Sequence, residues 1–106
     1  MRLSEQYIKN ALSLSLEMLS KNDGTIAARV WENVIKAIVA FAQEKSGKDV
    51  LAYALAFASF QSEFKAGDYI PIIKETLKVA EKIGIEDKET KELYDKVKGQ
   101  LSQRSS

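Results

Sequence analysis

Residues 26–45 form the segment that most restricts what this chain can fold into. When the segment is projected as a helix at about 100° per residue, its polar side chains gather in one stripe of roughly 100°. The opposite arc of about 260° is apolar and includes Val30, Trp31, Val34 and Phe41. A helix with so wide an apolar arc needs neighbours on several sides, so the pattern predicts an all-α core around this segment.

Composition supports a helical fold over the whole chain. The 106 residues contain only 5 Gly and 1 Pro, while hydrophobic residues make up 45% and charged residues 29%. This length suits one domain with one core, and the balance disfavours disorder or a turn-rich β-fold. We therefore expect a single helical-bundle domain over residues 1–101, followed by a disordered tail over residues 102–106.

Capping and turn signals predict five helices, over about residues 4–20, 26–45, 50–65, 69–83 and 87–100. Ser4 is the expected N-cap of the first helix, and Asp68 with Pro71 opens the fourth, which stops at Gly84. The last helix has a thin apolar stripe and is expected to dock lightly and fray. The predicted fold is an up-and-down bundle of four to five helices with the second and third at its centre.

The third predicted helix offers a candidate interface. Its aromatic residues Tyr53, Phe57, Phe60 and Phe64 share one side and are best explained as core. The remaining apolar and small residues form a flank that a second helix could approach closely, and this candidate interface comprises Leu51, Ala52, Leu55, Ala56 and Ser59. The wide apolar arcs therefore predict a homodimer, with a heterologous protein partner as the alternative.

Several classes of chemistry lack the residues that they need. The chain has no His and no Cys, which removes the usual general base, the commonest metal ligand and thiolate chemistry. Ser13, Ser15, Ser20 and Ser46 are interpreted as solvent-face or capping residues, and none lies in a Gly-x-Ser-x-Gly elbow. We therefore expect no enzyme activity, no metal and no cofactor.

The charge balance gives no general reason to bind nucleic acid or lipid. Sixteen Lys and Arg against fifteen Asp and Glu give a net charge of +1, so contact with nucleic acid is open but unsupported. The first residues lead directly into a periodic segment that contains charges, and no apolar run is long enough to span a bilayer. We therefore expect a cytoplasmic protein that makes no membrane contact.

The polar stripe of residues 26–45 is the one constellation that invites a functional interpretation. Its members Arg29, Glu32, Asn33 and Lys36 are neighbours at helical spacing. The favoured interpretation is an exposed or interfacial seam joined by salt bridges. The alternative is a polar pocket in which Arg29 and Lys36 bind an anion or an RNA phosphate.

Residues 19–47, with the sequence LSKNDGTIAARVWENVIKAIVAFAQEKSG, resemble the second-helix region of the HEPN superfamily, and most of all its archaeal paralogous-repeat branch. The shared pattern is a short turn before an Ala-rich helix that carries an aromatic residue and then a Lys-Ala step. Active members of that family are RNases with an Arg-x4-6-His motif, and this chain has no His. The resemblance therefore implies a dimeric helical bundle without nuclease activity.

Three functions follow as hypotheses. The leading one is a non-enzymatic, self-associating protein-interaction module, because the apolar arcs are wide and catalytic residues are missing. The second is an RNA-associated or toxin–antitoxin-type HEPN-like component that lacks nuclease activity, which rests on the resemblance. The third is a bundle that binds a small ligand in a pocket between its helices.

Overall fold

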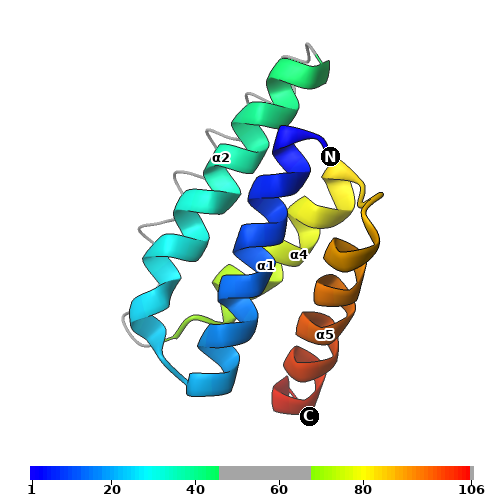
Figure 1. The fold of residues 1–106 in the computed structure, drawn as a ribbon. Coiled ribbons are helices and arrows are strands. Elements are labelled where there is room, and N and C mark those ends of the chain that lie inside the picture. Colours follow the sequence, from blue (N-terminus) through cyan, green and yellow to red (C-terminus); the bar gives the residue numbers. More distant parts are fainter. Residues whose placement is uncertain (46–67, 106) are drawn as a thin grey trace.

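A computed structural model describes residues 1–45 and 68–105, which form an all-α helical bundle, as the sequence predicts (Figure 1). The described elements are α1 (Leu3–Lys21), the short 3₁₀ turn η1 (Gly24–Ile26), α2 (Ala27–Lys45), α4 (Ile70–Ile83) and α5 (Lys88–Ser105). Helices α1 and α2 run in opposite directions, as do α4 and α5 (Figure 1). The predicted helix over 50–65 lies outside the described residues, together with its candidate interface.

Helix α1 begins one residue earlier than the sequence predicts. It starts at Leu3 after Arg2, so Ser4 lies inside the first turn and is not the N-cap. The Ser4 side chain instead donates to Glu44 on α2, a contact between residues distant in sequence. At its other end α1 closes on Asn22, whose φ of 50° is left-handed and whose N–H donates to the Met18 carbonyl.

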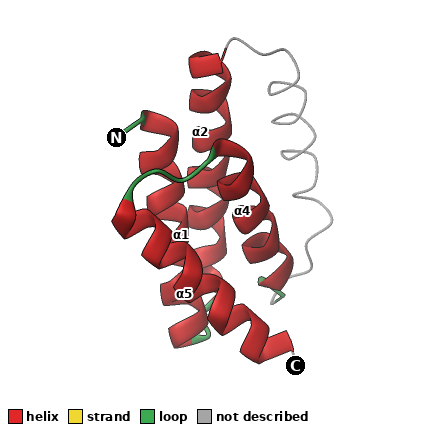
Figure 2. Ribbon diagram, turned by 90° about the vertical axis from the view of Figure 1, so that its right-hand side faces the viewer, coloured by secondary structure: helices red, strands yellow, loops and turns green. Residues whose placement is uncertain are grey.

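Helix α1, and not α2, is central among the described helices. It contacts α2, α4 and α5, whereas α2 contacts α1 and α4 but not α5 (Figure 2). Its buried face includes the small residues Ala11 and Ser15 beside Ile8 and Leu12, all at 0% exposure. Small side chains allow neighbouring backbones to approach closely, which is consistent with the central place of α1 among the described helices.

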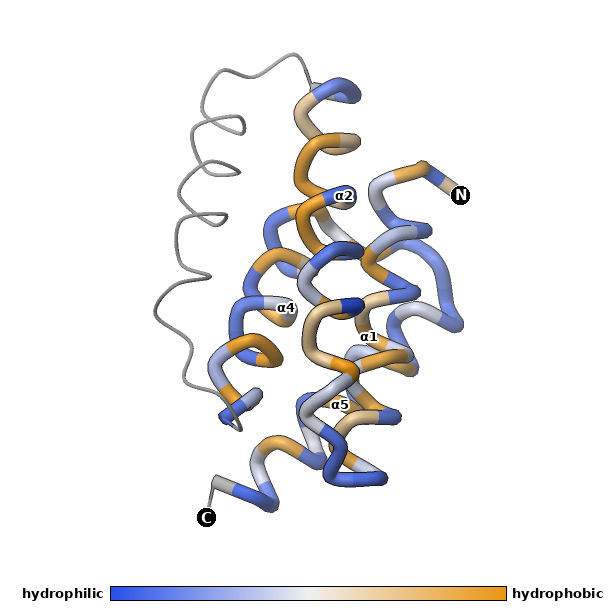
Figure 3. The backbone as a smooth tube through the Cα atoms, turned by 90° about the vertical axis from the view of Figure 1, so that its left-hand side faces the viewer, coloured by the Kyte–Doolittle hydropathy of each residue, from blue (hydrophilic) through white to orange (hydrophobic). Residues whose placement is uncertain are grey.

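Helix α2 buries most of its wide apolar arc, but the flank that carries Ala28 and Val39 is exposed. The buried residues lie against α1 and α4 and include Val30, Trp31, Val34, Ile38 and Phe41. Hydrophobic positions recur along α2 in Figure 3 up to its polar C-terminal end. The exposed part of α2 is therefore a narrow strip, and this strip bears on function below.

Helices α4 and α5 close the bundle. Pro71 lies in the first turn of α4, as expected, and Gly84 with a φ of 83° follows its end. Helix α5 buries Tyr94, Val97 and Leu101, the thin stripe seen in the sequence. Helix α4 and the buried stripe of α5 both pack against α1, although they are distant from it in the sequence.

The C-terminal segment differs from the expected disordered tail, because α5 continues to Ser105. The Arg104 guanidinium donates to the Leu19 carbonyl at 2.5 Å and to the Tyr69 hydroxyl at 2.8 Å. Tyr69 in turn donates to the Asn22 side chain at 2.6 Å. These contacts place a cation at the C-terminal end of α1, where the free carbonyls favour positive charge. The contacts of Arg104 attach the last turn of α5 to the bundle, because this turn has almost no apolar residues that could pack.

Candidate functional site

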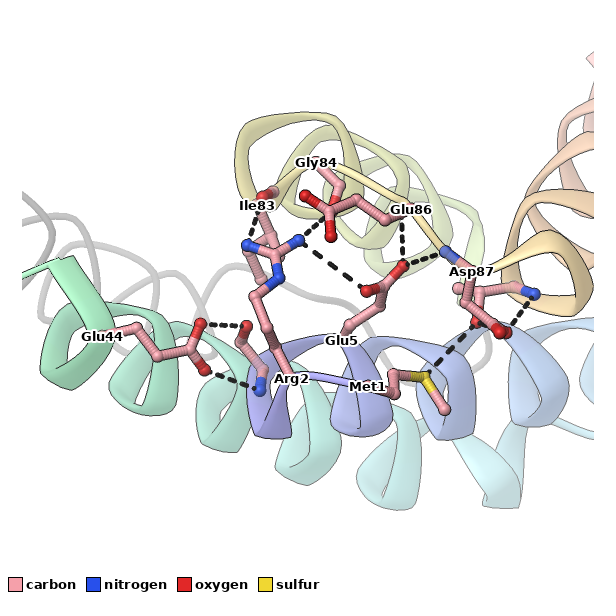
Figure 4. Close-up of polar contacts among 10 residues, drawn as sticks. Met1, Arg2, Glu5, Glu44, Ile83, Gly84, Glu86 and Asp87 are labelled. Atoms are coloured by element: carbon pink, nitrogen blue, oxygen red, sulfur yellow. Dashed lines mark hydrogen bonds and ion pairs between the residues drawn. The ribbon is translucent and has the colours of Figure 1, made fainter.

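A buried polar cluster at the start of α1 is the first feature to consider, because buried carboxylates are common at catalytic sites. The Glu5 carboxylate is 2% exposed and accepts the backbone N–H groups of Glu86 and Asp87 at 2.6 and 2.8 Å. Arg2 donates to the carbonyls of Ile83 and Gly84 at 3.3 and 2.5 Å (Figure 4). We call Arg2, Ser4 and Glu5 with their partners the N-terminal latch.

The side chains of the latch hydrogen-bond to backbone groups and to one another's helices, so few of their polar atoms remain available for catalysis. Arg2 also lies 3.8 Å from the second oxygen of Glu5, so both oxygens of this carboxylate have partners. The Ser4 N–H and hydroxyl donate to the two oxygens of Glu44 at 3.1 and 2.8 Å. The latch joins α1 to α2 and to the α4–α5 connection, and its role is structural.

A surface groove between α1 and α2 is the second feature. It has a volume of about 240 Å³. The residues that line it, which define the α1–α2 groove, are Leu3, Tyr7, Ile35, Lys36, Val39, Ala40 and Gln43. The two helices lie side by side along much of their length in Figure 1, and the groove follows their contact near the start of α1. Most of its lining is apolar.

The groove displays hydrophobic side chains to solvent. Leu3 is 51% exposed and Val39 is 39% exposed, which makes them, with Met1, the exposed large hydrophobic residues of the described chain. Lys36 stands at the groove's edge, with its Nζ 6.0 Å from the centre of the Tyr7 ring. Apolar residues that gather around a hollow with a polar edge are typical of protein-interaction surfaces.

The predicted polar stripe lies on the exposed side of α2. Lys36 pairs with Glu32 at 3.0 Å, and the Asn33 side chain donates to the Arg29 carbonyl at 2.8 Å. The hydrogen bond to Glu32 and its charge raise the pKa of Lys36 above its ordinary value. This arrangement is the salt-bridged seam favoured above. Lys36 lines the α1–α2 groove but Arg29 does not, so these two cations do not share that pocket.

Sequence reasoning missed Val39, which it counted as part of the apolar arc. Five exposed residues of α2 lie at alternating spacings of three and four, and we call them the α2 stripe: Arg29, Glu32, Lys36, Val39 and Gln43. Ala28 and Glu44 are exposed beside this stripe. The alternating spacing keeps residues on one side of a helix and was visible in the sequence. Val39 is therefore an apolar residue within a polar stripe.

One of the serine residues lies elsewhere than the sequence predicts. Ser15 is fully buried, contrary to its interpretation as a solvent-face or capping residue, because α1 is covered on more sides than predicted. In residues 1–45 and 68–105 there is no group of three or more acidic residues that could hold a metal ion. No helix within the same ranges is long and apolar enough to cross a membrane.

Comparison with known proteins adds no relative. No protein-family model matches the chain, and no curated protein or solved structure matches it significantly. The HEPN resemblance of residues 19–47 therefore stays a prediction, and function has to be argued from the groove and the α2 stripe.

Proposed function

We propose that this chain is a non-enzymatic, self-associating protein-interaction module, and that the α1–α2 groove is its contact surface. The observation that carries the proposal is the exposure of Leu3 and Val39 on either side of one groove. Full burial of a large apolar side chain contributes about 1.5–3 kcal/mol, and these two side chains are about half exposed, so covering each contributes roughly half as much and favours association. This exposed groove, which lies within the described residues, supports the proposed homodimer.

The dimensions of the groove support a protein contact more than a small-ligand site. Ligand pockets usually measure about 300–1,000 Å³ and enclose most of the ligand. The groove measures about 240 Å³ and opens at the surface, where exposed side chains border it. An open apolar groove with a charged edge suits a second protein surface better.

The charge around the groove gives the RNA-associated alternative little support. Phosphate binding relies on several uncompensated cations along one track. Lys36 is the cation that lines the groove, and it already pairs with Glu32. Binding of RNA by this chain at low salt would instead support the RNA-associated alternative.

The proposal is tested by the solution mass, measured by light scattering over a micromolar concentration series at low and high salt. We expect a dimer that persists at high salt, because apolar burial is not screened. Val39→Glu should shift the equilibrium to monomer, since it places a charge in the apolar contact. Ser102→Glu adds the same charge to the exposed end of α5, which does not contact α2, and should leave the dimer intact. A monomeric parent chain would refute the proposal.

A further inference from the structure

Polar contacts with α1 hold both ends of helix α5. At the start of α5, Glu5 accepts the backbone N–H of Asp87 at 2.8 Å. At its end, the Arg104 guanidinium donates to the Leu19 carbonyl at 2.5 Å. Glu5 and Leu19 lie near opposite ends of α1, so these contacts fasten α5 along the length of that helix (Figure 1).

The apolar part of this attachment is small. The buried apolar residues of α5 are Tyr94, Val97 and Leu101, whereas most of the buried apolar residues of the described chain belong to α1, α2 and α4. Within residues 1–45 and 68–105, α5 contacts α1 and α4 and makes no contact with α2. Detachment of α5 would therefore leave the packing among α1, α2 and α4 in place.

The connection between α4 and α5, residues 84–87, has the features of a hinge. Hinges are short segments at the ends of elements that absorb changes in backbone angles. Gly84 follows α4 with a φ of 83°, a left-handed conformation that Gly adopts at little cost. The N-terminal latch holds this hinge, because Arg2 donates to the Gly84 carbonyl at 2.5 Å and Glu5 accepts from Glu86 at 2.6 Å. Release of the latch would free the hinge and the start of α5 together.

We propose that α5 is a strap that detaches from α1 as one cooperative unit about this hinge, while α1, α2 and α4 stay packed. A segment with few buried apolar contacts opens at a lower free energy than the core of a protein. The strap is independent of the proposed contact surface. Glu5 and Lys9 contact the α5 side, Lys9 through Glu89 at 2.6 Å, and Tyr7 of the groove lies two residues from each, or about 200° around α1.

Amide hydrogen exchange of the full chain, followed residue by residue, tests the proposal. The amides of Tyr94, Val97 and Leu101 should share one opening free energy, below that of the slowest amides of α2. Ile38→Val weakens the packing of α2, which does not contact α5. This variant should accelerate the slowest α2 amides by about two- to tenfold and leave the three α5 amides unchanged. Equal acceleration of both sets would mean that α5 opens only when the whole bundle unfolds, and it would overturn the inference.

Glu5→Ala tests whether α5 opens as a unit. Loss of a hydrogen bond to a charged group should accelerate all three α5 amides by about tenfold or more, although Leu101 lies near the opposite end of the helix. Gln6→Ala, at an exposed neighbour of Glu5, should leave their exchange unchanged. Acceleration confined to the first turn of α5 would indicate fraying and overturn the inference. The Ile38→Val comparison decides the question by itself if Glu5→Ala does not fold.

Discussion

Glu5, in the first turn of α1, accepts the backbone N–H of Asp87, the residue before α5, at 2.8 Å. Asp87 in turn accepts the N–H and hydroxyl of Thr90 at 3.1 and 2.8 Å, which caps the start of α5. One carboxylate therefore positions the residue that starts another helix 82 positions later in the sequence. The stability of the bundle should depend on this contact more than on any exposed ion pair.

Replacing Glu5 by Ala should lower the free energy of unfolding by about 2–4 kcal/mol, because two part-buried N–H groups lose their acceptor. Glu5→Gln should cost less, since its amide oxygen can still accept both hydrogen bonds. Urea denaturation measures the change, and Gln6→Ala, at an exposed neighbour, is the matched control. Equal stabilities of Glu5→Ala and Gln6→Ala would show that the latch contributes nothing.

Ser15→Ala should raise the free energy of unfolding by about 1 kcal/mol. The Ser15 hydroxyl is buried and has no hydrogen-bond partner among the described residues, so it loses water without compensation. Ser13→Ala, at an exposed position of the same helix, controls for the higher helix propensity of Ala. Chemical denaturation of the two variants checks this, and a Ser15→Ala protein no more stable than Ser13→Ala would contradict it.

Removing the Arg104 guanidinium should loosen the last turn of α5 without unfolding the bundle. Its hydrogen bonds to Leu19 and Tyr69 hold a segment with little apolar surface. In Arg104→Ala, amide hydrogen exchange after Leu101 should accelerate by about tenfold, as expected for loss of a charged hydrogen bond. Ser102→Ala should leave the exchange rates nearly unchanged. Unaltered exchange in Arg104→Ala would mean that helix propensity alone maintains this turn.

Tyr94 should titrate at unusually high pH. Burial, followed by the hydrogen bond to Glu81 and its charge, raises the pKa of Tyr94 from 10.0 to about 12. Because the folded state favours the neutral phenol, this contribution to stability is fully present below pH 10 and is lost as pH rises towards about 12.

Ultraviolet absorbance during a pH titration measures the Tyr94 transition directly. Tyr94→Phe should remove the transition near pH 12, and Glu81→Gln should move it to lower pH by removing the negative charge. Circular dichroism at each pH confirms that the chain is still folded. If Tyr94→Phe leaves every transition above pH 11 in place, the assignment fails.

Helix type and helix ends were largely readable from the sequence, because they depend on local interactions. The period of residues 26–45, Pro71 in a first turn and Gly84 after a helix end each act within a few residues. The wide apolar arc of α2 also predicted that most of this helix is buried. The expected seam of Glu32 and Lys36 involves residues one turn apart, so the helix itself brings them together.

The sequence did not predict in the same way which helix faces are buried. Ser15, Glu5 and Arg104 look like ordinary surface residues in sequence, and each acquires its environment from a segment distant along the chain. Val39 shows the reverse case, since its apolar side chain predicts burial but the neighbours of α2 leave it exposed. Local periodicity determined that the chain is helical. The packing of distant helices around α1 decided which residues are buried and where the groove lies, because burial depends on long-range contacts that local patterns do not encode.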